Sequence, residues 1–480
     1  MMFPALTLTY WLTLHGMVTV IAVLIYLIAS HVLQHRRHPT AAIAWVLFIL
    51  LIPYVALPSF LAFGSRKQAR PRRIAPPLVA VIDAPLPEAP ANSAEEPWAI
   101  QTALALRQPA PAAYRALKLH ADGDAALQAL WQVIDGAQHS IDLCTFIIGR
   151  DALVEAVIER LCAKARAGVR VRLLLDGLGS LMAGRPKLKA LTDCGGEFLL
   201  FVPPLHSPLK GRTNLRDHRK MLITDAAHET RRLWCGGRNL AREYFEARGD
   251  KPAWHDLSFD LQGRFVQQAS DLFERDWAFA SGRKPVFSLA DLAPAEPSTG
   301  EDALGAQLIA SGPDQIDDTV YSLLVTAAYR AQRRIALVTP YFVPDSSLLM
   351  ALCLAARRGV AVDLLLPARS NHGMSDVARA RALRSFAAAG GRIWLAPHMQ
   401  HAKLAVIDDA LALAGSANFD SRSLFLNYEL MVAFHEPADV AQFADWFERE
   451  RASATSCTPK QPGLLRDIAE GLVLWVGFQL

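Results

Sequence analysis

The chain carries the same arrangement of polar residues twice, and this duplication limits its possible folds more than any other feature. The segment HAKLAVIDDALALAGSANFD begins at residue 401, and DHRKMLITDAAHETRRLWCGGRNL begins at residue 217. In both, a histidine is followed by a lysine, an aspartate and a turn of small residues that ends in asparagine. The matched residues are His218, Lys220, Asp225 and Asn239 in the first copy, and His401, Lys403, Asp408 and Asn418 in the second. We therefore expect two related halves.

Each half also contains a strand-helix-strand pattern. The runs HSIDLCTFIIGRDALVEAVIERLCAKARAGVRVRLLLDGLGS, from His139, and RRIALVTPYFVPDSSLLMALCLAARRGVAVDLLLPARS, from Arg333, each give an apolar strand, an amphipathic helix, a Gly-Val turn and a buried strand. Strands that alternate with helices indicate mostly parallel sheets covered by helices. The sequence predicts an α/β fold with two duplicated lobes built on mostly parallel, mixed sheets.

The first 65 residues are apolar enough to cross a membrane. No Lys, Arg, Asp or Glu occurs before residue 35, and LTLHGMVTVIAVLIYLIASHVL is long enough to span the ~30 Å hydrocarbon core as a helix. A second charge-free run, TAAIAWVLFILLIPYVALPSFLAFG, follows the turn QHRRHP. A cleaved signal peptide fits poorly, because no basic region precedes the first run and a second span follows at once. We predict a transmembrane helical hairpin.

The distribution of basic residues predicts how that hairpin is oriented. The turn contains Arg36 and Arg37, whereas the segment after the second span contains Arg66, Lys67, Arg70, Arg72 and Arg73. Basic residues favour the cytoplasmic side of a membrane. The chain is therefore expected to be a multi-pass membrane protein with the lobes in the cytoplasm.

The remaining boundaries follow from composition. Prolines and small residues between residues 71 and 97 disfavour regular structure and indicate a tether. The predicted organisation is a hairpin over 1–65, a basic and then Pro-rich tether over 66–99, a first lobe over 100–285, a linker over 286–302 and a second lobe over 303–480. The last ten residues, GLVLWVGFQL, are too short to span a bilayer and are expected to dock on the second lobe.

Net charge and cysteine content exclude few classes of protein or partner. The formal charge of +4 on 480 residues gives only a mild preference for acidic partners. Six cysteines occur without a C-x-x-C pair, so neither a zinc site nor a disulfide framework is indicated.

The repeated residues suit chemistry on a phosphodiester. An ammonium and an amide, from Lys220 with Asn239 and from Lys403 with Asn418, hold nonbridging oxygens, while a histidine attacks phosphorus or transfers a proton. With two copies, one histidine forms a covalent phosphohistidine and the other protonates the leaving alcohol. No metal and no other cofactor is expected, because two lysines supply the positive charge. A single His-x-Lys pair on a strand is usually a surface pair, but two copies with the same spacing argue against that interpretation.

These motifs resemble a known family. HxKxxxxD repeated, with GGRN in one half and GSANFDSRSLFLNYE in the other, is similar to the phospholipase D superfamily. The chain as far as about residue 450 resembles membrane-anchored bacterial cardiolipin synthases, and VRLLLDGLGS, TPYFVPD and NYE support that resemblance. It implies two α/β/α lobes with the active site between them, and transfer of a phosphatidyl group between two phosphatidylglycerol molecules to give cardiolipin and glycerol. It also favours His218 as the nucleophile and implies a location in the bacterial inner membrane.

The sequence departs from that family in two places. The segment LAREYFEARGDKPAWHDLSFDLQG has His255 where the family more often has an arginine, although Asp256 remains, and the loop AAHETRR lengthens the first motif. Four basic residues near that motif either attract an anionic headgroup or form a solvated loop: Lys210, Arg212, Arg216 and Arg219.

Strand alternation predicts which carboxylates orient the histidines. Asp225 and Asp408 have the opposite parity to their histidines and lie about 20 Å along an extended strand, so they are expected to hold the hairpin turn. Glu429 is then expected to support His401, and Asp256 to support His218.

Several alternatives stay open. A hydrolytic phospholipase D would share every catalytic residue, and a nuclease or an inactive membrane scaffold is less favoured, since the chain is nearly neutral and both motifs are intact. The expected partners are a membrane and an anionic phospholipid, not nucleic acid. The sequence does not decide the second substrate, the acyl preference or the oligomeric state.

Overall fold

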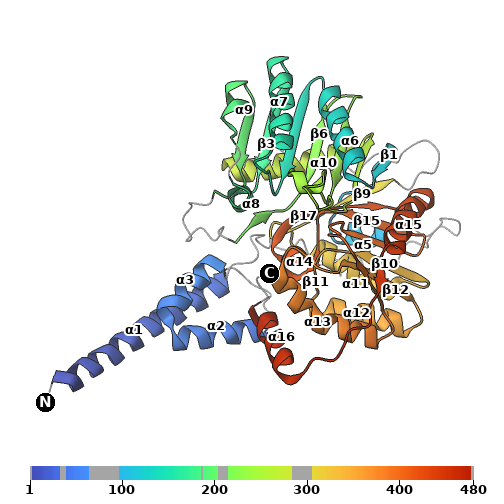
Figure 1. Cartoon of the computed structure of the whole chain (residues 1–480). Coiled ribbons are helices and arrows are strands. Elements are labelled where there is room, and N and C mark those ends of the chain that lie inside the picture. The colour runs from blue at the N-terminus through green and yellow to red at the C-terminus, as the bar shows by residue number, and fades with distance from the viewer. Residues whose placement is uncertain are drawn as a thin grey trace, which may run out of the picture. The chain divides into compact units, whose positions relative to one another are not determined.

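The computed structural model describes residues 3–32, 39–63, 97–184, 187–203, 214–283 and 305–476. They fall into a helical N-terminal unit and an α/β unit (Figure 1). Four features of the sequence lie outside the described residues: the turn with Arg36 and Arg37, the basic segment 66–73, residues 74–96 of the tether, and the linker 286–302.

The N-terminal unit contains α1 (Phe3–Val32), α2 (Pro39–Leu51) and α3 (Pro53–Phe63). Among the described residues, one helix is long and apolar enough to cross a membrane, over Thr9–Leu27. The second apolar run is divided after Leu51, because Pro53 has no N–H to donate to the Ile49 carbonyl. The first predicted span is thus present, and the second is not confirmed as one long helix.

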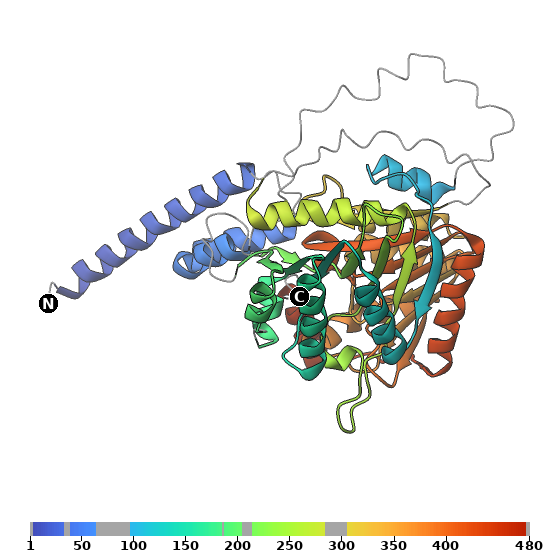
Figure 2. The same cartoon turned by 90° about the horizontal axis from the view of Figure 1, so that it is seen from above.

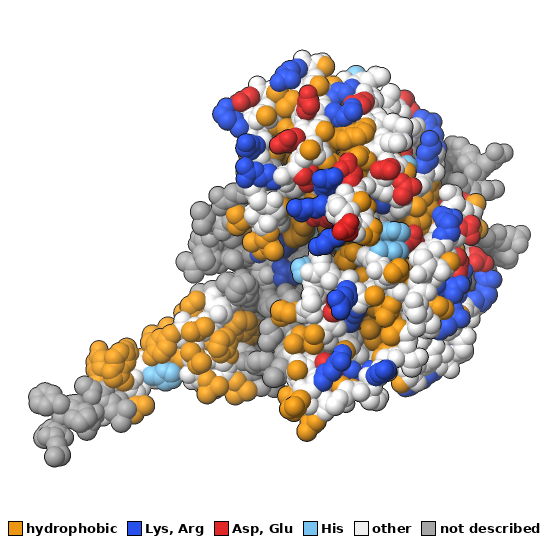
Figure 3. All heavy atoms as spheres, in the orientation of Figure 1, with side chains coloured by type: hydrophobic (Ala, Val, Ile, Leu, Met, Phe, Trp, Pro, Cys, Tyr) orange, Lys and Arg blue, Asp and Glu red, His pale blue; other side chains and the backbone are white. Residues whose placement is uncertain are grey.

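The helices of this unit pack through a small apolar core. Tyr26 of α1 lies against Phe60 of α3, with ring centroids 4.9 Å apart, and Ile49 of α2 is fully buried. Outside this core, large apolar side chains cover the helices (Figure 3), and Trp11 and Val55 are 62% and 53% exposed. An apolar surface of this kind suits lipid better than water.

The first lobe is built on a seven-stranded sheet. Its strands are β1 (Arg115–His120), β2 (Ser140–Thr145), β3 (Arg170–Leu175), β4 (Glu197–Leu200), β6 (Met221–Thr224), β7 (Arg232–Gly236) and β8 (Ser258–Gln262). Its helices are α6 (Gly123–Gly136), α7 (Ala152–Arg166), α8 (Gly177–Met182), α9 (Lys189–Asp193), the 3-10 helix η2 (Arg242–Tyr244) and α10 (Phe265–Ser281).

The second lobe is built on a nine-stranded sheet. It contains β9 (Ala306–Ser311), β10 (Arg334–Val338), β12 (Ala361–Pro367), β13 (Arg392–Ala396), β14 (Leu404–Ile407), β15 (Leu411–Gly415), β17 (Asn427–Phe434), β18 (Thr455–Ser456) and, from the first half of the chain, β5 (Arg216–Asp217). Strands β11 (Phe342–Val343) and β16 (Phe419–Asp420) form a separate pair. The helices are α11 (Thr319–Arg330), α12 (Ser346–Arg357), α13 (Gly373–Ala388), α14 (Ser421–Phe425), α15 (Pro437–Ala452) and α16 (Leu464–Val476), together with α5 (Trp98–Ala105) from the start of the unit.

The strand order confirms the duplication. The first sheet runs β1-β8-β7-β6-β2-β3-β4, and the second contains the matching path β9-β17-β15-β14-β10-β12-β13. The predicted strand-helix-strand units are β2-α7-β3 and β10-α12-β12, and both strand pairs are parallel. The expectation that the sheets are mostly parallel is wrong, because each motif lies on an antiparallel hairpin, β6-β7 or β14-β15, and the neighbouring pairs are antiparallel too.

Helices cover both faces of each sheet. In the first lobe α6 and α7 share an apolar core with Leu222 and Trp234, while α10 lies on the other face, where Glu274 accepts hydrogen bonds from Arg172 of β3. Figure 2 shows α10 from above, in yellow-green. In the second lobe α11 and α12 occupy the position of α6 and α7.

The first and last helices of the α/β unit pack on the second lobe. Although α5 precedes the first lobe in the chain, its Ala99 and Ala103 belong to the second lobe's core. Helix α16 packs on α13, where Arg384 donates a 2.7 Å hydrogen bond to Glu470. Helix α16 thus packs on the second lobe, while residues 477–480 of the last ten lie outside the described residues.

Candidate active site

Each histidine motif begins on a segment that pairs with the other lobe. Strand β5, just before His218, is parallel to β17 of the second lobe, and the His218 N–H donates to the Tyr428 carbonyl at 2.9 Å. In the second motif, Gln400 forms a parallel bridge with His255 of the first lobe, and the His401 N–H donates to the His255 carbonyl at 2.6 Å. Both motifs therefore lie where the lobes meet.

Because of this pairing, each histidine contacts a carboxylate that belongs to the other lobe. His218 Nδ1 lies 2.9 Å from Glu429, and His401 Nδ1 lies 2.7 Å from Asp256 Oδ2. The predicted partners, Glu429 for His401 and Asp256 for His218, are therefore wrong. The reason is geometric: Glu429 follows Tyr428 and Asp256 follows His255, so each carboxylate comes next to the histidine whose backbone is paired with its own segment.

The two carboxylates are fixed in different ways. Glu429 accepts hydrogen bonds from the Ser416 hydroxyl at 2.5 Å and from Asn427 Nδ2 at 3.3 Å. Asp256 accepts from the Leu257 N–H at 2.7 Å. Gly237 occupies the position in the first motif that Ser416 has in the second, and a Cβ there would lie 2.2 Å from Asp256 Oδ1. Glycine thus permits the close approach of Asp256. Sequence reasoning missed Ser416, although its alignment with Gly237 could have revealed it.

Both lysines point back toward their own histidine. Lys220 Nζ donates to the His218 carbonyl at 2.6 Å, and Lys403 Nζ donates to the His401 carbonyl and lies 2.8 Å from His401 Nδ1. Each lysine is 1% exposed, while His218 and His401 are 8% and 4% exposed. The His218 ring is thus the most accessible of these four side chains.

The two asparagines differ. Asn239 Oδ1 accepts from the Ile147 N–H at 3.2 Å, and its Nδ2 donates to the Tyr244 hydroxyl at 2.8 Å. Asn418 is buried, and within the described part of the chain its Oδ1 has no hydrogen-bond partner. Phosphate binding by both residues stays a prediction, and Asn239 would have to share its amide with Tyr244.

Asp225 and Asp408 lie away from the histidines, as strand parity predicted. Asp225 accepts hydrogen bonds from the backbone N–H groups that lead into β2, the shortest at 2.7 Å from His139. Asp408 accepts from those that lead into β10, the shortest at 2.8 Å from Arg333. Both occupy left-handed turns, with φ of 51° and 49°. They tie each motif hairpin to the neighbouring strand.

Three aromatic side chains that the sequence did not single out surround the histidines. The Phe146 ring meets His218 edge to face at 4.9 Å. Tyr244 meets His401 in the same way at 5.1 Å, and Trp254 lies 5.6 Å from it. Trp254 lies two residues before Asp256, and this spacing was the signal in the sequence that could have identified Trp254 as a site residue.

One of the four basic residues near the first motif does not face a ligand. Arg219 is fully buried and forms an ion pair with Asp276, which excludes for this residue both alternatives, a contact with a headgroup and a solvated position. Arg216 is partly buried near Asp176. Burial lowers the pKa of Arg216 by more than the charge of Asp176 raises it. Lys210 and Arg212 lie outside the described residues.

Burial dominates the electrostatics of the site. It lowers the pKa of His218 to about 4 and that of His401 to about 3, so both rings are neutral near pH 7. It also lowers the pKa of Lys220 to about 8 and that of Lys403 to about 7. The charge of Lys403 acts on His218 and that of Lys220 acts on His401, so the two motifs form one electrostatic site.

The carboxylates remain ionised. Burial would raise the pKa values of Asp256 and Glu429, but the neighbouring histidine and lysines more than offset it and lower both. Two neutral imidazoles, each hydrogen-bonded to a carboxylate at one nitrogen, are suited to nucleophilic attack and proton transfer.

Comparison with known proteins agrees with this geometry. The family model "Cardiolipin synthase, PLD-like domain" matches residues 130–277 and 324–451, and "Phospholipase_D-nuclease N-terminal" matches residues 19–65. The chain is 31% identical to cardiolipin synthase A of Pseudomonas entomophila, over 88% of this chain and 87% of that protein. It is 30% identical to cardiolipin synthase A of Escherichia coli, over 97% of both.

Solved structures show the same fold. Phosphatidylserine synthase of Haemophilus influenzae superposes with a TM-score of 0.59 at 12% identity, over 80% of this chain and 100% of that one. With two phospholipase D-like lobes, the paired motifs between them and relatives that match nearly its whole length, the chain belongs to the cardiolipin synthase family of phosphatidyltransferases, within the phospholipase D superfamily.

Proposed function

We propose that this chain is a cardiolipin synthase that transfers a phosphatidyl group from one phosphatidylglycerol to another through a phosphohistidine. The observation that carries the proposal is the crossed arrangement: two neutral histidines, each held at Nδ1 by a buried carboxylate, with two lysines within the same electrostatic site.

In the first half-reaction, His218 Nε2 attacks phosphorus. A P–N bond forms, and the bond from phosphorus to the glycerol headgroup oxygen breaks. His401 gives a proton to that oxygen, so glycerol leaves as a neutral alcohol. The assignment of His218 as nucleophile is supported by its greater exposure and by the family resemblance.

In the second half-reaction, the hydroxyl of a second phosphatidylglycerol attacks the phosphohistidine. His401 takes the proton from that hydroxyl, the P–N bond breaks, and cardiolipin leaves with both histidines restored. Lys220 and Lys403 stabilise the charge on the nonbridging oxygens, and Asn418, in the motif of Lys403, can donate to them through Nδ2. Phosphate charge beside the histidines raises their pKa values, which lets His401 carry the proton.

We also propose that the N-terminal unit crosses the membrane twice. Helical hydrogen bonding continues from α2 into α3, where the Ala56 N–H donates to the Ile52 carbonyl at 2.9 Å, so the two helices can act as one kinked span. The five basic residues after α3 support a cytoplasmic position for the lobes.

Purified chain incubated with phosphatidylglycerol tests the activity. Cardiolipin and glycerol are expected in equal amounts, and the double variant His218→Ala, His401→Ala should give neither. Phosphatidic acid and glycerol without cardiolipin would show instead that water accepts the phosphatidyl group, as in a hydrolytic phospholipase D.

A further inference from the structure

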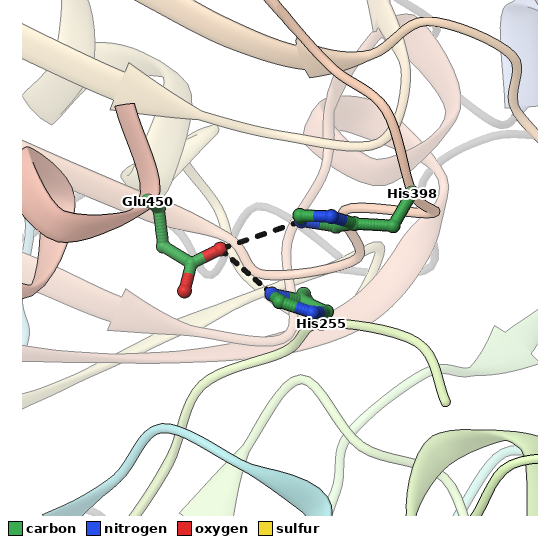
Figure 4. A group of neighbouring side chains, drawn as sticks. All are labelled: His255, His398 and Glu450. Atoms are coloured by element: carbon green, nitrogen blue, oxygen red, sulfur yellow. Dashed lines mark hydrogen bonds and ion pairs between the residues drawn. The ribbon is translucent and has the colours of Figure 1, made fainter. Parts of the chain in front are cut away.

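A second cluster of metal-ligand side chains lies outside the two motifs. His255, His398 and Glu450 place one nitrogen or oxygen ligand atom each within 4.8 Å of one another (Figure 4). His255 comes from the first lobe, whereas His398 follows β13 and Glu450 lies on α15 of the second lobe. Among the described parts of the chain, no other group of His, Cys, Asp and Glu meets this condition.

The three side chains converge on one oxygen atom. His255 Nδ1 lies 3.0 Å from Glu450 Oε2, within hydrogen-bonding distance. His398 Nε2 is buried, lies 3.6 Å from the same oxygen and has no hydrogen-bond partner among the residues that the structure describes. The two imidazole rings are stacked, with centroids 3.4 Å apart and planes inclined by 21°. A buried ring nitrogen that points at a carboxylate without bonding to it is poorly satisfied, and a shared cation would satisfy it.

The surrounding contacts hold these ligands in place. Gln400 Nε2 donates to Glu450 Oε2 at 2.8 Å, and the His255 N–H donates to the Met399 carbonyl at 2.9 Å. The cluster is thus supported by hydrogen bonds to side chain and backbone, as ligands of protein-bound metals usually are. The His255 side chain is 42% exposed, which leaves access for an ion and for a water ligand.

We propose that His255, His398 and Glu450 bind a divalent transition-metal ion of the zinc class, which joins the first lobe to the second. Two imidazoles and a carboxylate are typical ligands for such ions, whereas Mg²⁺ and Ca²⁺ prefer oxygen ligands alone. Neither the sequence, from which no metal was expected, nor the catalytic proposal requires this site.

The position of the cluster gives the ion a structural effect on catalysis. Asp256, which contacts His401, directly follows His255, and the His401 N–H donates to the His255 carbonyl. An ion at the cluster would fix the backbone that holds this carboxylate–histidine pair. We therefore expect the ion to stabilise the contact between the lobes, while the chemical step itself proceeds without it.

Metal binding by the full chain tests the proposal. The protein is purified in detergent through an affinity tag that lacks histidine, stripped with a chelator and titrated with Zn²⁺ against a chromophoric competitor. One ion should bind per chain and raise the thermal unfolding temperature, whereas Mg²⁺ should not. His255→Asn, His398→Asn and Glu450→Gln should each weaken Zn²⁺ binding by more than the roughly 10–100-fold that loss of an outer-shell partner costs.

The chain offers a matched control. His228 stacks on His139 with ring centroids 3.6 Å apart, but this exposed pair belongs to no metal-ligand group among the described residues. His228→Asn should therefore bind Zn²⁺ as the wild type does. The proposal is wrong if stripped wild-type protein, still showing a cooperative thermal transition, binds no Zn²⁺, or if the three ligand variants bind it as tightly as the His228→Asn control.

Discussion

The His218 imidazole and the Glu429 carboxylate lie 2.9 Å apart although 211 residues separate them in the chain. The reciprocal pair, His401 and Asp256, makes the same contact in the opposite direction between the lobes. Each lobe therefore supplies one histidine and the carboxylate that orients the other lobe's histidine.

This contact predicts the effect of Glu429→Gln. The amide cannot stabilise a charged imidazole as a carboxylate does, so turnover should fall by roughly 10²–10⁴-fold. The thermal unfolding temperature should change little, since glutamine keeps the size of the side chain. Ser416→Ala removes only one hydrogen bond to Glu429 and should cause a smaller loss of turnover. Wild-type turnover in Glu429→Gln would contradict the proposed role.

A donor with a good leaving group separates the two histidines. A phosphatidyl ester of p-nitrophenol needs no proton on its leaving oxygen, so the burst of nitrophenolate should survive in Asp256→Asn, where the acid His401 is impaired. It should be lost in Glu429→Gln, where the nucleophile His218 is impaired. The reverse pattern would exchange the roles of the two histidines.

A trapping experiment tests the covalent intermediate. Quenching in an alkaline denaturant, in which the P–N bond is stable, after mixing with a radiolabelled phosphatidyl donor should leave label on the wild-type chain, at His218, and later acid treatment should release it. His218→Ala should carry none, and label that survives in the double variant His218→Ala, His401→Ala would exclude a phosphohistidine on either motif.

The pH dependence of kcat/KM follows from the buried lysines. The pKa values of Lys403 and Lys220 are about 7 and about 8. Because we propose that the ammonium forms bind phosphate, kcat/KM should fall as pH rises through this range. The alkaline limb of kcat should lie at higher pH, since bound phosphate raises both pKa values. A flat kcat/KM profile between about pH 6 and about pH 9 would show that the charged lysines are not required.

Asp225 should matter for stability more than for chemistry. Its hydrogen bonds from three backbone N–H groups outweigh burial and lower its pKa below the usual 3.8. A carboxyl group whose pKa is lowered by folding stabilises the fold above its unfolded pKa, and this contribution is lost as pH falls through the lowered value. Asp225→Asn, which still tolerates the positive φ, should lower the free energy of unfolding by about 1–3 kcal/mol at neutral pH. It should also make the free energy of unfolding less dependent on pH in the acid range.

Asp408→Asn should likewise lower the thermal unfolding temperature. Thermal melts at several pH values measure both effects, and a loss of turnover with unchanged stability would place these residues in the chemistry instead.

Part of this site was predictable from sequence. Strand parity was enough to turn Asp225 and Asp408 away from the histidines, because a side chain's face depends only on local geometry. Parity could not say which carboxylate meets which histidine. That depends on the pairing of β5 with β17 and of Gln400 with His255, which joins segments from different lobes. The motif hairpins were expected, but the antiparallel pairs that join them to the rest of each sheet were not, since strand-helix-strand patterns reveal only the parallel pairs.

The topology of the N-terminal unit can be tested with cysteines. Cys194, Cys353 and Cys457 are partly exposed, and Cys144, Cys162 and Cys235 are buried. If the lobes are cytoplasmic, a membrane-impermeant thiol reagent should label none of the six in intact cells and should label the exposed three after lysis. Labelling from outside would reverse the proposed orientation.

The joining of both lobes in one chain also has an evolutionary consequence. In a symmetric dimer of single lobes, every substitution near one histidine would be repeated near the other. In this chain, the position occupied by Gly237 in the first half holds Ser416 in the second. Asn239 is bonded to Tyr244, while Asn418 Oδ1 has no hydrogen-bond partner in the part of the chain that the structure describes. Two halves within one chain are thus free to differ, so that one histidine can specialise as nucleophile while the other specialises in moving protons.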